Sequence, residues 1–196
     1  RPYLNITEWN VSDVDADDSV WQQTKARLPW LLIGIIGGIV NSLILGGFEA
    51  QIQAVAALAL FIPLIGGTGG NVGVQASAIV VQGLANGRLD VKDSIRQISK
   101  EVLVGLLNAT VISAVVMLYN LIMLPGNYAV TFSVSMSLFC VVIFATVFGC
   151  LVPLTLEKLK IDPALATGPF IQITNDVVGM FIYVGVSTWL LNVLPH

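Results

Sequence analysis

The sequence predicts an all-α membrane protein with five transmembrane helices, and three observations lead to this prediction. The first is composition: 56% of the 196 residues are hydrophobic and only 11% are charged, whereas a soluble domain carries about 25% charged residues. The mean hydropathy is +0.85. The second is the length of the uncharged runs, which reach 38 residues at 50–87 and 55 residues at 102–156. The third is that five spans place every Lys and Arg on one side of the membrane.

The same composition argues against several other classes of protein. A water-soluble enzyme, a nucleic-acid binder and a disordered tail all fit poorly, because the net charge is only −3 and there is no basic excess. Cys140 and Cys150 both fall in an apolar run, so neither a disulfide framework nor a zinc site is indicated. The single histidine, His196, is the last residue and is interpreted as a chain end rather than a ligand. With no nucleotide loop, nucleophile or catalytic dyad apparent, we expect no enzyme activity.

The boundaries of the five helices follow from the apolar runs. A helix needs about 20 mainly apolar residues to cross about 30 Å of hydrocarbon. The run at 102–156 divides at Pro125-Gly126, a turn signal near its middle. The run at 50–87 is too long for one straight helix across a bilayer, so we expect that helix to be strongly tilted, broken or extended into water. The predicted spans are residues 29–48, 52–84, 101–124, 129–156 and 163–194.

The positive charges provide a check on this number of spans. They precede the first span, lie between the second and third, and lie between the fourth and fifth, which are the same side if there are five. These residues are Arg1, Lys25, Arg27, Arg88, Lys92, Arg96, Lys100, Lys158 and Lys160. By the positive-inside rule, the N-terminus is predicted to be cytoplasmic and the C-terminus extracytoplasmic.

The segment before the first span is predicted to be a cytoplasmic linker, residues 1–28, with an amphipathic part. It lacks the basic start and apolar stretch of a signal peptide and carries an acidic cluster at 13–18 instead. Ser19 is expected to cap a short helix that presents Val20, Trp21 and Leu28 at helical spacing. The abrupt opening at Arg1 leads us to expect a fragment of a longer protein.

The second span contains a glycine-rich segment, residues 63–75, in which five of thirteen residues are Gly. Glycine and proline weaken a helix, and irregular backbone in a membrane is tolerated only against protein or water. We therefore expect a break here. Asn71 and Gln75 share one helical face, and Gln82 follows on it. Two interpretations stay open: a pore wall, or close helix packing through small residues with the amides bonding between helices.

The fifth span contains Asp176, the only acidic residue well inside any predicted span. An Asp at a helix centre costs about 2.5–3.5 kcal/mol on the insertion scale, and the predicted spans hold no Lys or Arg to pair with it. It therefore faces a cavity, binds a cation or is protonated. Gly168 and Gln172 precede it at four-residue intervals and are predicted to line the same face. The alternative is a protonated Asp176 bonded to a neighbouring helix, for example to Asn71.

Two prolines mark the start of this fifth helix. Pro163 is predicted to begin it, and Pro169 to remove the amide that would bond the carbonyl of Leu165.

One carboxylate per chain restricts the choice of ion. Calcium takes six to eight oxygen ligands, whereas magnesium keeps several waters and is held by one or two carboxylates. A symmetric dimer would bring two Asp176 side chains to one axis, which suits hydrated Mg²⁺ or another divalent cation. A Thr-Val-Gly-Tyr-Gly potassium filter is absent from the sequence. Coupling to Na⁺ or H⁺ through Asp176 stays open.

Two long motifs of this chain resemble the MgtE family of magnesium transporters. The stretch Gly-Gly-Thr-Gly-Gly-Asn-Val-Gly-Val-Gln at 66–75 is similar to the family's second-helix motif. The stretches 162–169 and 174–179, with Tyr183, are similar to its fifth-helix motif. The resemblance implies a homodimer in a prokaryotic plasma membrane, with five helices per protomer and a pore at the dimer axis. It further implies that the second and fifth helices line the pore and that Mg²⁺ is the transported ion.

The resemblance also implies roles for particular residues. A hydrated Mg²⁺ is expected near the carboxylate of Asp176, the one candidate metal residue. The candidates for lining the pore or contacting the ion's waters are Asn71, Gln75, Gly168, Gln172 and Asn175. Many members carry Mg²⁺-binding regulatory domains ahead of the first helix, and the acidic segment 13–18 takes the place of the linker to them.

The expected function is therefore channel-like Mg²⁺ transport by a dimeric pore, with no nucleic-acid partner. One alternative is a secondary transporter that exchanges cations with Na⁺ or H⁺ through Asp176. The other is an assembly or anchoring subunit that transports nothing itself.

Overall fold

Five long helices account for most of the fold in the computed structural model, which describes residues 15–164 and 168–194. Every regular element in these residues is helical, and five helices are long and apolar enough to cross a membrane, as predicted. The long helices are α1 (Val20–Gly47), α3 (Ile62–Ala85), α4 (Ser94–Met123), α5 (Tyr128–Lys158) and α6 (Pro169–Val193). Three short elements join them: α2 (Glu49–Ala54) and the 3₁₀ helices η2 (Ala56–Phe61) and η3 (Val91–Asp93).

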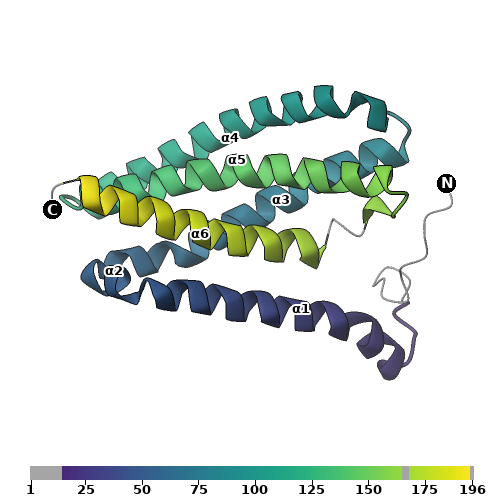
Figure 1. The fold of residues 1–196 in the computed structure, drawn as a ribbon, viewed down its shortest axis with the longest axis horizontal. Helices are drawn as coiled ribbons and strands as arrows, with labels where there is room; N and C mark the ends of the chain where they lie inside the picture. Colours follow the sequence, from purple (N-terminus) through teal and green to yellow (C-terminus); the bar gives the residue numbers. More distant parts are fainter. Residues whose placement is uncertain (1–14, 165–167, 195–196) are drawn as a thin grey trace.

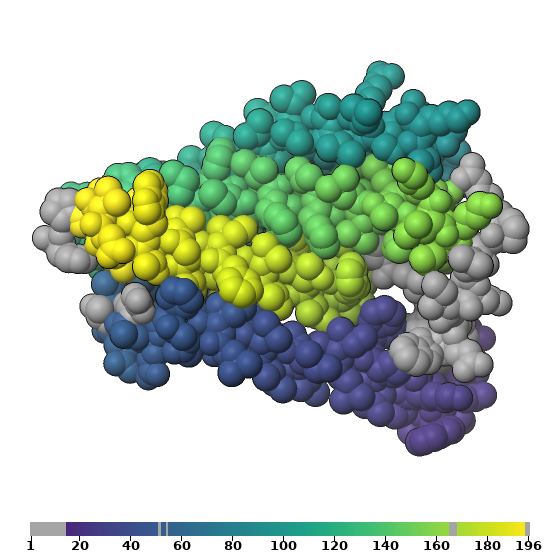
Figure 2. Space-filling model, viewed as in Figure 1, coloured from purple at the N-terminus to yellow at the C-terminus, as the bar shows by residue number. Residues whose placement is uncertain are grey.

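Helix α5 lies at the centre of the bundle and packs against α3, α4 and α6 (Figure 1). It is also the most buried of the five helices. Helix α1 lies at the edge and packs mainly on α6. Figure 2 shows α6 lying between α5 and α1 across one face of the molecule. The bundle therefore has a well-packed body of four helices and one peripheral helix.

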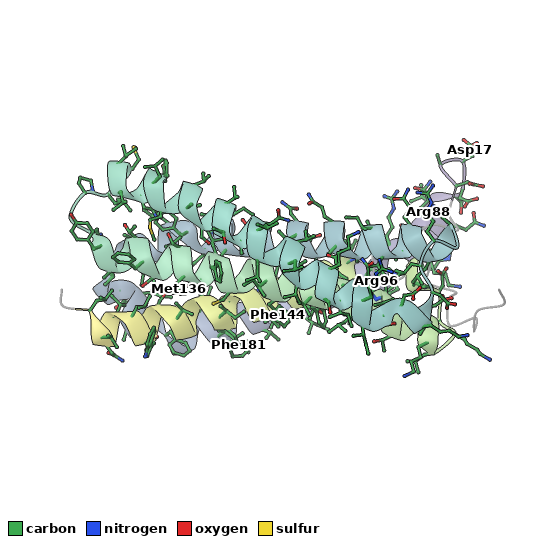
Figure 3. The ribbon with its side chains drawn as sticks, turned by 90° about the horizontal axis from the view of Figure 1, so that it is seen from above. Asp17, Arg88, Arg96, Met136, Phe144 and Phe181 are labelled. Atoms are coloured by element: carbon green, nitrogen blue, oxygen red, sulfur yellow. The ribbon has the colours of Figure 1, made fainter. Side chains whose placement is uncertain are left out.

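The Lys and Arg residues of the described chain gather at one end of the bundle, together with several acidic residues. Asp17, Arg88 and Arg96 lie at this end, whereas Met136 and Phe181 lie along the rest of the long axis (Figure 3). At this end α1 begins, α3 is joined to α4, and α5 ends (Figure 1). We call it the basic end, because it holds every Lys and Arg of the described residues, in 25–27, 88–100 and 158–160.

The first helix begins at the cap that the sequence predicts, Ser19, but it continues into the first span instead of forming a short helix ahead of it. The backbone N–H of Gln22 donates to Ser19 Oγ at 3.3 Å, and the N–H of Ser19 donates to Gln22 Oε1 at 3.0 Å, which is a capping box. The helix then continues through Pro29 to Gly47. The prediction of a separate short helix is therefore wrong, because Pro29 does not end the helix.

The second span is broken, but upstream of the glycines rather than among them. The backbone leaves the α region at Val55 and continues as the 3₁₀ helix η2, whereas the glycine-rich segment 63–75 lies wholly within α3. Pro63 occupies the first turn of α3, where a missing N–H costs no hydrogen bond. The predicted break at the glycines is wrong, because the neighbouring helices that pack against them stabilise the helix there.

Tyr183 stabilises the irregular backbone of η2. Its hydroxyl donates to the carbonyl oxygen of Leu58 at 2.6 Å, and both residues are almost fully buried in one apolar cluster. Because carbonyl groups at helix ends and breaks need partners away from water, this bond from α6 supplies what the interrupted helix lacks.

The last helix begins at Pro169, six residues later than predicted. Gly168 precedes it with an extended backbone (φ −112°, ψ −142°), as expected before a proline. Pro169 then occupies the first helical position, where its fixed φ favours the helix. Pro163 lies in a short 3₁₀ segment that precedes α6, so the predicted start of the long helix there is wrong. Leu165 lies outside the described residues.

Replacing Tyr183 by Phe is expected to destabilise the protein, because the buried carbonyl of Leu58 loses its donor at a cost of about 1–3 kcal/mol. Thermal unfolding in detergent should show a lower midpoint than for the wild type. Tyr119→Phe is the matched control, since that side chain is 55% exposed and its loss should leave the midpoint unchanged. Equal midpoints for both variants would contradict this role of Tyr183.

Candidate functional site

The candidate site is centred on Asp176, a half-buried residue of α6 that faces the glycines of α3. A Cβ atom built on Gly66 would lie 3.6 Å from Asp176 Oδ1, and one built on Gly70 would lie 3.5 Å from the same oxygen. The carboxylate therefore faces this part of α3 at a distance where an added methyl group would be in van der Waals contact with it. Larger residues at these two positions would fill the space beside the carboxylate.

A groove of about 590 Å³ opens beside Asp176 between α1, α3 and α6. Gly168, Gln172 and Asp176 line it from α6, and Val74 lines it from α3. From α1 the groove is lined by Gly34 and by apolar side chains. The three α6 residues expected on one face thus lie together in a single groove.

Asn71 and Gln75 lie on the exposed face of α3, as does Gln82. They share this face, as their spacing predicts, but they are not among the residues that line the groove. In a membrane, exposed amides would meet hydrocarbon at a cost of several kcal/mol each unless water or protein covers them. The face therefore requires a polar environment.

Asn175 lies apart from the groove, in the interface between α6 and α3. It is 1% exposed, and a Cβ on Gly73 would collide with its Nδ2 atom. Neither polar atom of its side chain has a hydrogen-bond partner among the described residues. Asn175 therefore packs in the helix interface, although the family motif placed it among the candidate pore residues.

Glycines bring α3, α5 and α6 close together behind the site. A Cβ on Gly149 would lie 2.6 Å from the carbonyl oxygen of Gly73, and one on Gly69 would lie 2.9 Å from Val141 Cγ1. Both contacts are too short for any other residue without movement of the backbone or a neighbour. The four-residue spacing of Gly69 and Gly73 is typical of close helix contacts in membranes and marks this face of α3. Gly149 stands alone in α5 and is identified as a packing residue only by its contact with Gly73.

Asp176 forms no ion pair with a Lys or Arg among the described residues. It lies seven residues into α6, about 10 Å along the helix from its start. No cluster of three or more His, Cys, Asp or Glu that could hold a metal occurs in the described part of the chain. Such a site suits a cation that keeps most of its waters, as Mg²⁺ does.

The alternative of a protonated Asp176 bonded to Asn71 finds no counterpart in the structure. Asn71 is exposed, and no hydrogen bond joins it to Asp176 among the described residues.

Comparison with known proteins gives matches along most of the chain. The family described as MgtE, divalent cation transporter, matches residues 62–186. A curated relative from Bacillus subtilis (strain 168), "Magnesium transporter MgtE", is 34% identical over 182 residues, which cover 93% of this chain and 40% of the relative. A relative of the same name from Thermus thermophilus is 38% identical over 184 residues, 91% of this chain and 40% of that protein. The chain spans about two fifths of the length of these relatives.

Gly149→Ala is expected to destabilise the bundle, because the new methyl group would meet the backbone of α3 and overpacking typically costs about 1–3 kcal/mol. The control is Gly38→Ala in α1, where a Cβ would meet nothing within 4 Å and alanine favours the helix. Thermal unfolding in detergent should show a lower midpoint for the first variant and an equal or higher one for the second. Equal stability of the two variants would contradict the close contact of α5 with α3.

Proposed function

Because the chain belongs to the MgtE family of divalent cation transporters, we propose that it forms a channel-like pore for Mg²⁺ in a prokaryotic plasma membrane. The five apolar helices and the names of the bacterial relatives support a membrane transport role. The observation that carries the proposal is the Asp176 carboxylate, half-buried within a membrane helix, beside the glycines of α3 and open to a groove. An intramembrane carboxylate with no basic partner is by default functional.

The pore is proposed to form between two copies of the chain, around an axis lined by α3 and α6. The exposed amides of Asn71, Gln75 and Gln82 support this arrangement, because a partner copy and a water-filled pore would both cover them. One carboxylate per chain becomes two in a symmetric dimer. A local charge of about −2 matches a divalent cation bound through its waters.

In the proposed mechanism, the ion moves through the pore without losing its inner waters. Asp176 attracts the hydrated cation electrostatically, and Gln172, one turn earlier on the same face, accepts hydrogen bonds from its waters. The backbone of the α3 glycines keeps the wall beside the ion free of side chains. No covalent step is required. A divalent ion that crosses the whole membrane potential gains about 4.6 kcal/mol per 100 mV, so inward flow needs no coupled ion.

The charges assign an orientation to this pore. With the basic end in the cytoplasm, α1 begins inside and α6 ends outside. Residues 1–28 are then the cytoplasmic linker and residues 29–196 the transmembrane pore domain.

Asp176→Asn is expected to lower Mg²⁺ uptake into liposomes that contain the purified chain by about 10–100-fold, the typical effect of losing an outer-shell partner of a metal. The control is Glu49→Gln, which removes an exposed carboxylate at the start of α2 and should leave uptake unchanged. A fluorescent Mg²⁺ indicator inside the vesicles measures the flux under an imposed voltage. Wild-type rates from a folded Asp176→Asn protein would exclude Asp176 as the ion site.

The same assay distinguishes the exchanger from the pore. A pore passes Mg²⁺ on voltage alone, whereas an exchanger that uses Asp176 requires a Na⁺ or H⁺ gradient. Absence of flux under every gradient would favour an assembly or anchoring subunit.

Cysteine cross-linking tests the dimer. In a background with Cys140 and Cys150 replaced by Ala, Gln75→Cys is expected to give a cross-linked dimer with a short bismaleimide in membranes, because the exposed α3 face lies at the proposed axis. Leu107→Cys on α4 is the control, since that side chain is 71% exposed and faces lipid in this arrangement. Cross-linking at Leu107 but not at Gln75 would place the interface elsewhere.

A further inference from the structure

A second cavity, of about 460 Å³, lies at the basic end of the bundle, where α1 begins, α5 ends and α6 begins (Figure 1). Trp30, Phe148 and Phe170 line it together with aliphatic residues of α5 such as Leu151. Its one hydroxyl group belongs to Thr155, which donates to the carbonyl oxygen of Leu151 at 2.8 Å. The cavity thus presents an apolar and aromatic surface, in the size range of sites for small ligands, about 300–1,000 Å³.

Two cations lie about one helical turn beyond residues that line this cavity. Arg27 precedes Trp30 by about one turn of α1, and Lys158 follows Thr155 by about one turn of α5. Lys158 is also seven residues from Leu151, so the two share a helical face. Both cations are exposed. The Arg27 guanidinium donates to Gln23 Oε1 at 3.4 Å through Nη2, and its remaining donors can reach an anion.

We propose that this cavity holds an acyl chain of an anionic phospholipid, whose phosphate lies at Arg27 and Lys158. The cavity and the nearby cations match the two parts of such a molecule. The aromatic and aliphatic side chains that line the cavity contact the acyl chain, and the two cations about one turn beyond them bind the headgroup. Basic pockets between membrane helices favour anionic headgroups, and aromatic residues such as Trp30 occur at headgroup level. Asp176 does not line this cavity, although Trp30 borders both the cavity and the groove beside Asp176.

A third cavity supplies a comparison within the same molecule. It also measures about 460 Å³ and is lined by α4, α5 and the end of α6, with Met117, Phe132 and Leu194 among its residues. It lies toward the opposite end of the bundle, which carries no Lys or Arg in the described chain. Acyl chains should enter this cavity without any preference for headgroup charge. The selectivity of the cavity at the basic end is therefore attributed to Arg27 and Lys158, not to its apolar lining.

The test uses quenching of tryptophan fluorescence by phospholipids with brominated chains. Trp9, Trp21 and Trp189 are replaced by Phe, so that Trp30 reports on the cavity. A matched variant keeps only Trp189, which is 60% exposed near the opposite end of α6. Each is reconstituted in vesicles with brominated phosphatidylglycerol or brominated phosphatidylcholine. At Trp30 the anionic lipid should bind at least about fivefold more tightly than phosphatidylcholine, because one basic residue near an anionic surface contributes about this factor. At Trp189 the two lipids should bind equally.

Charge removal completes the test. Arg27→Gln with Lys158→Gln should abolish the preference at Trp30. Arg88→Gln with Lys92→Gln removes the same charge from the same end, but from the segment between α3 and α4, which does not line the cavity, and should preserve the preference. Equal binding of both lipids at Trp30 in the otherwise native chain would overturn the proposal. A preference that survives Arg27→Gln with Lys158→Gln would also overturn it, because it would then come from the general charge of the basic end. Circular dichroism checks that each variant is folded.

Discussion

The contact of α6 with the glycine face of α3 is the constraint on which the site depends. Along this contact, Gly70 allows Gln172 to approach, since a Cβ there would lie 3.1 Å from Gln172 Cγ, and Gly73 accommodates the amide of Asn175. Membrane helices gain little from hydrophobic association, because lipid is as apolar as their side chains. Close packing through small residues therefore contributes much of the attraction between them. Here the same packing also leaves the space that the Asp176 carboxylate occupies.

This contact separates two neighbouring polar residues of α6. Successive residues on a helix point about 100° apart, so Asn175 turns into the interface whereas Asp176 turns toward the groove. Asn175 is 1% exposed, but Asp176 is half-buried. A rotation of α6 by one residue would bury the carboxylate against α3 and expose the amide. The helix packing thus determines which of the two faces the groove.

The irregular backbone of the second span is stabilised by α6, the same helix that lines the groove. The break at Val55 and η2 lies toward the end of the bundle opposite the basic end, where Tyr183 of α6 bonds the carbonyl of Leu58. The glycines remain in a regular helix because α5 and α6 pack against them. Helix α6 therefore contributes both to the stability of the break and to the groove, which links the two regions through one rigid helix.

The sequence alone determined the five spans, the grouping of Lys and Arg between them, the family and the presence of one carboxylate, Asp176, within a span. These follow from local properties, because the cost of placing each residue in hydrocarbon depends mainly on that residue and its near neighbours. Only the tertiary structure decided that the chain breaks before Pro63, that α6 begins at Pro169, and that Gly149 packs on Gly73. It also placed Asn175 in the interface. These features depend on contacts between residues far apart in the chain. Glycine both weakens a helix and permits close packing, and only the neighbouring helix decides which effect prevails.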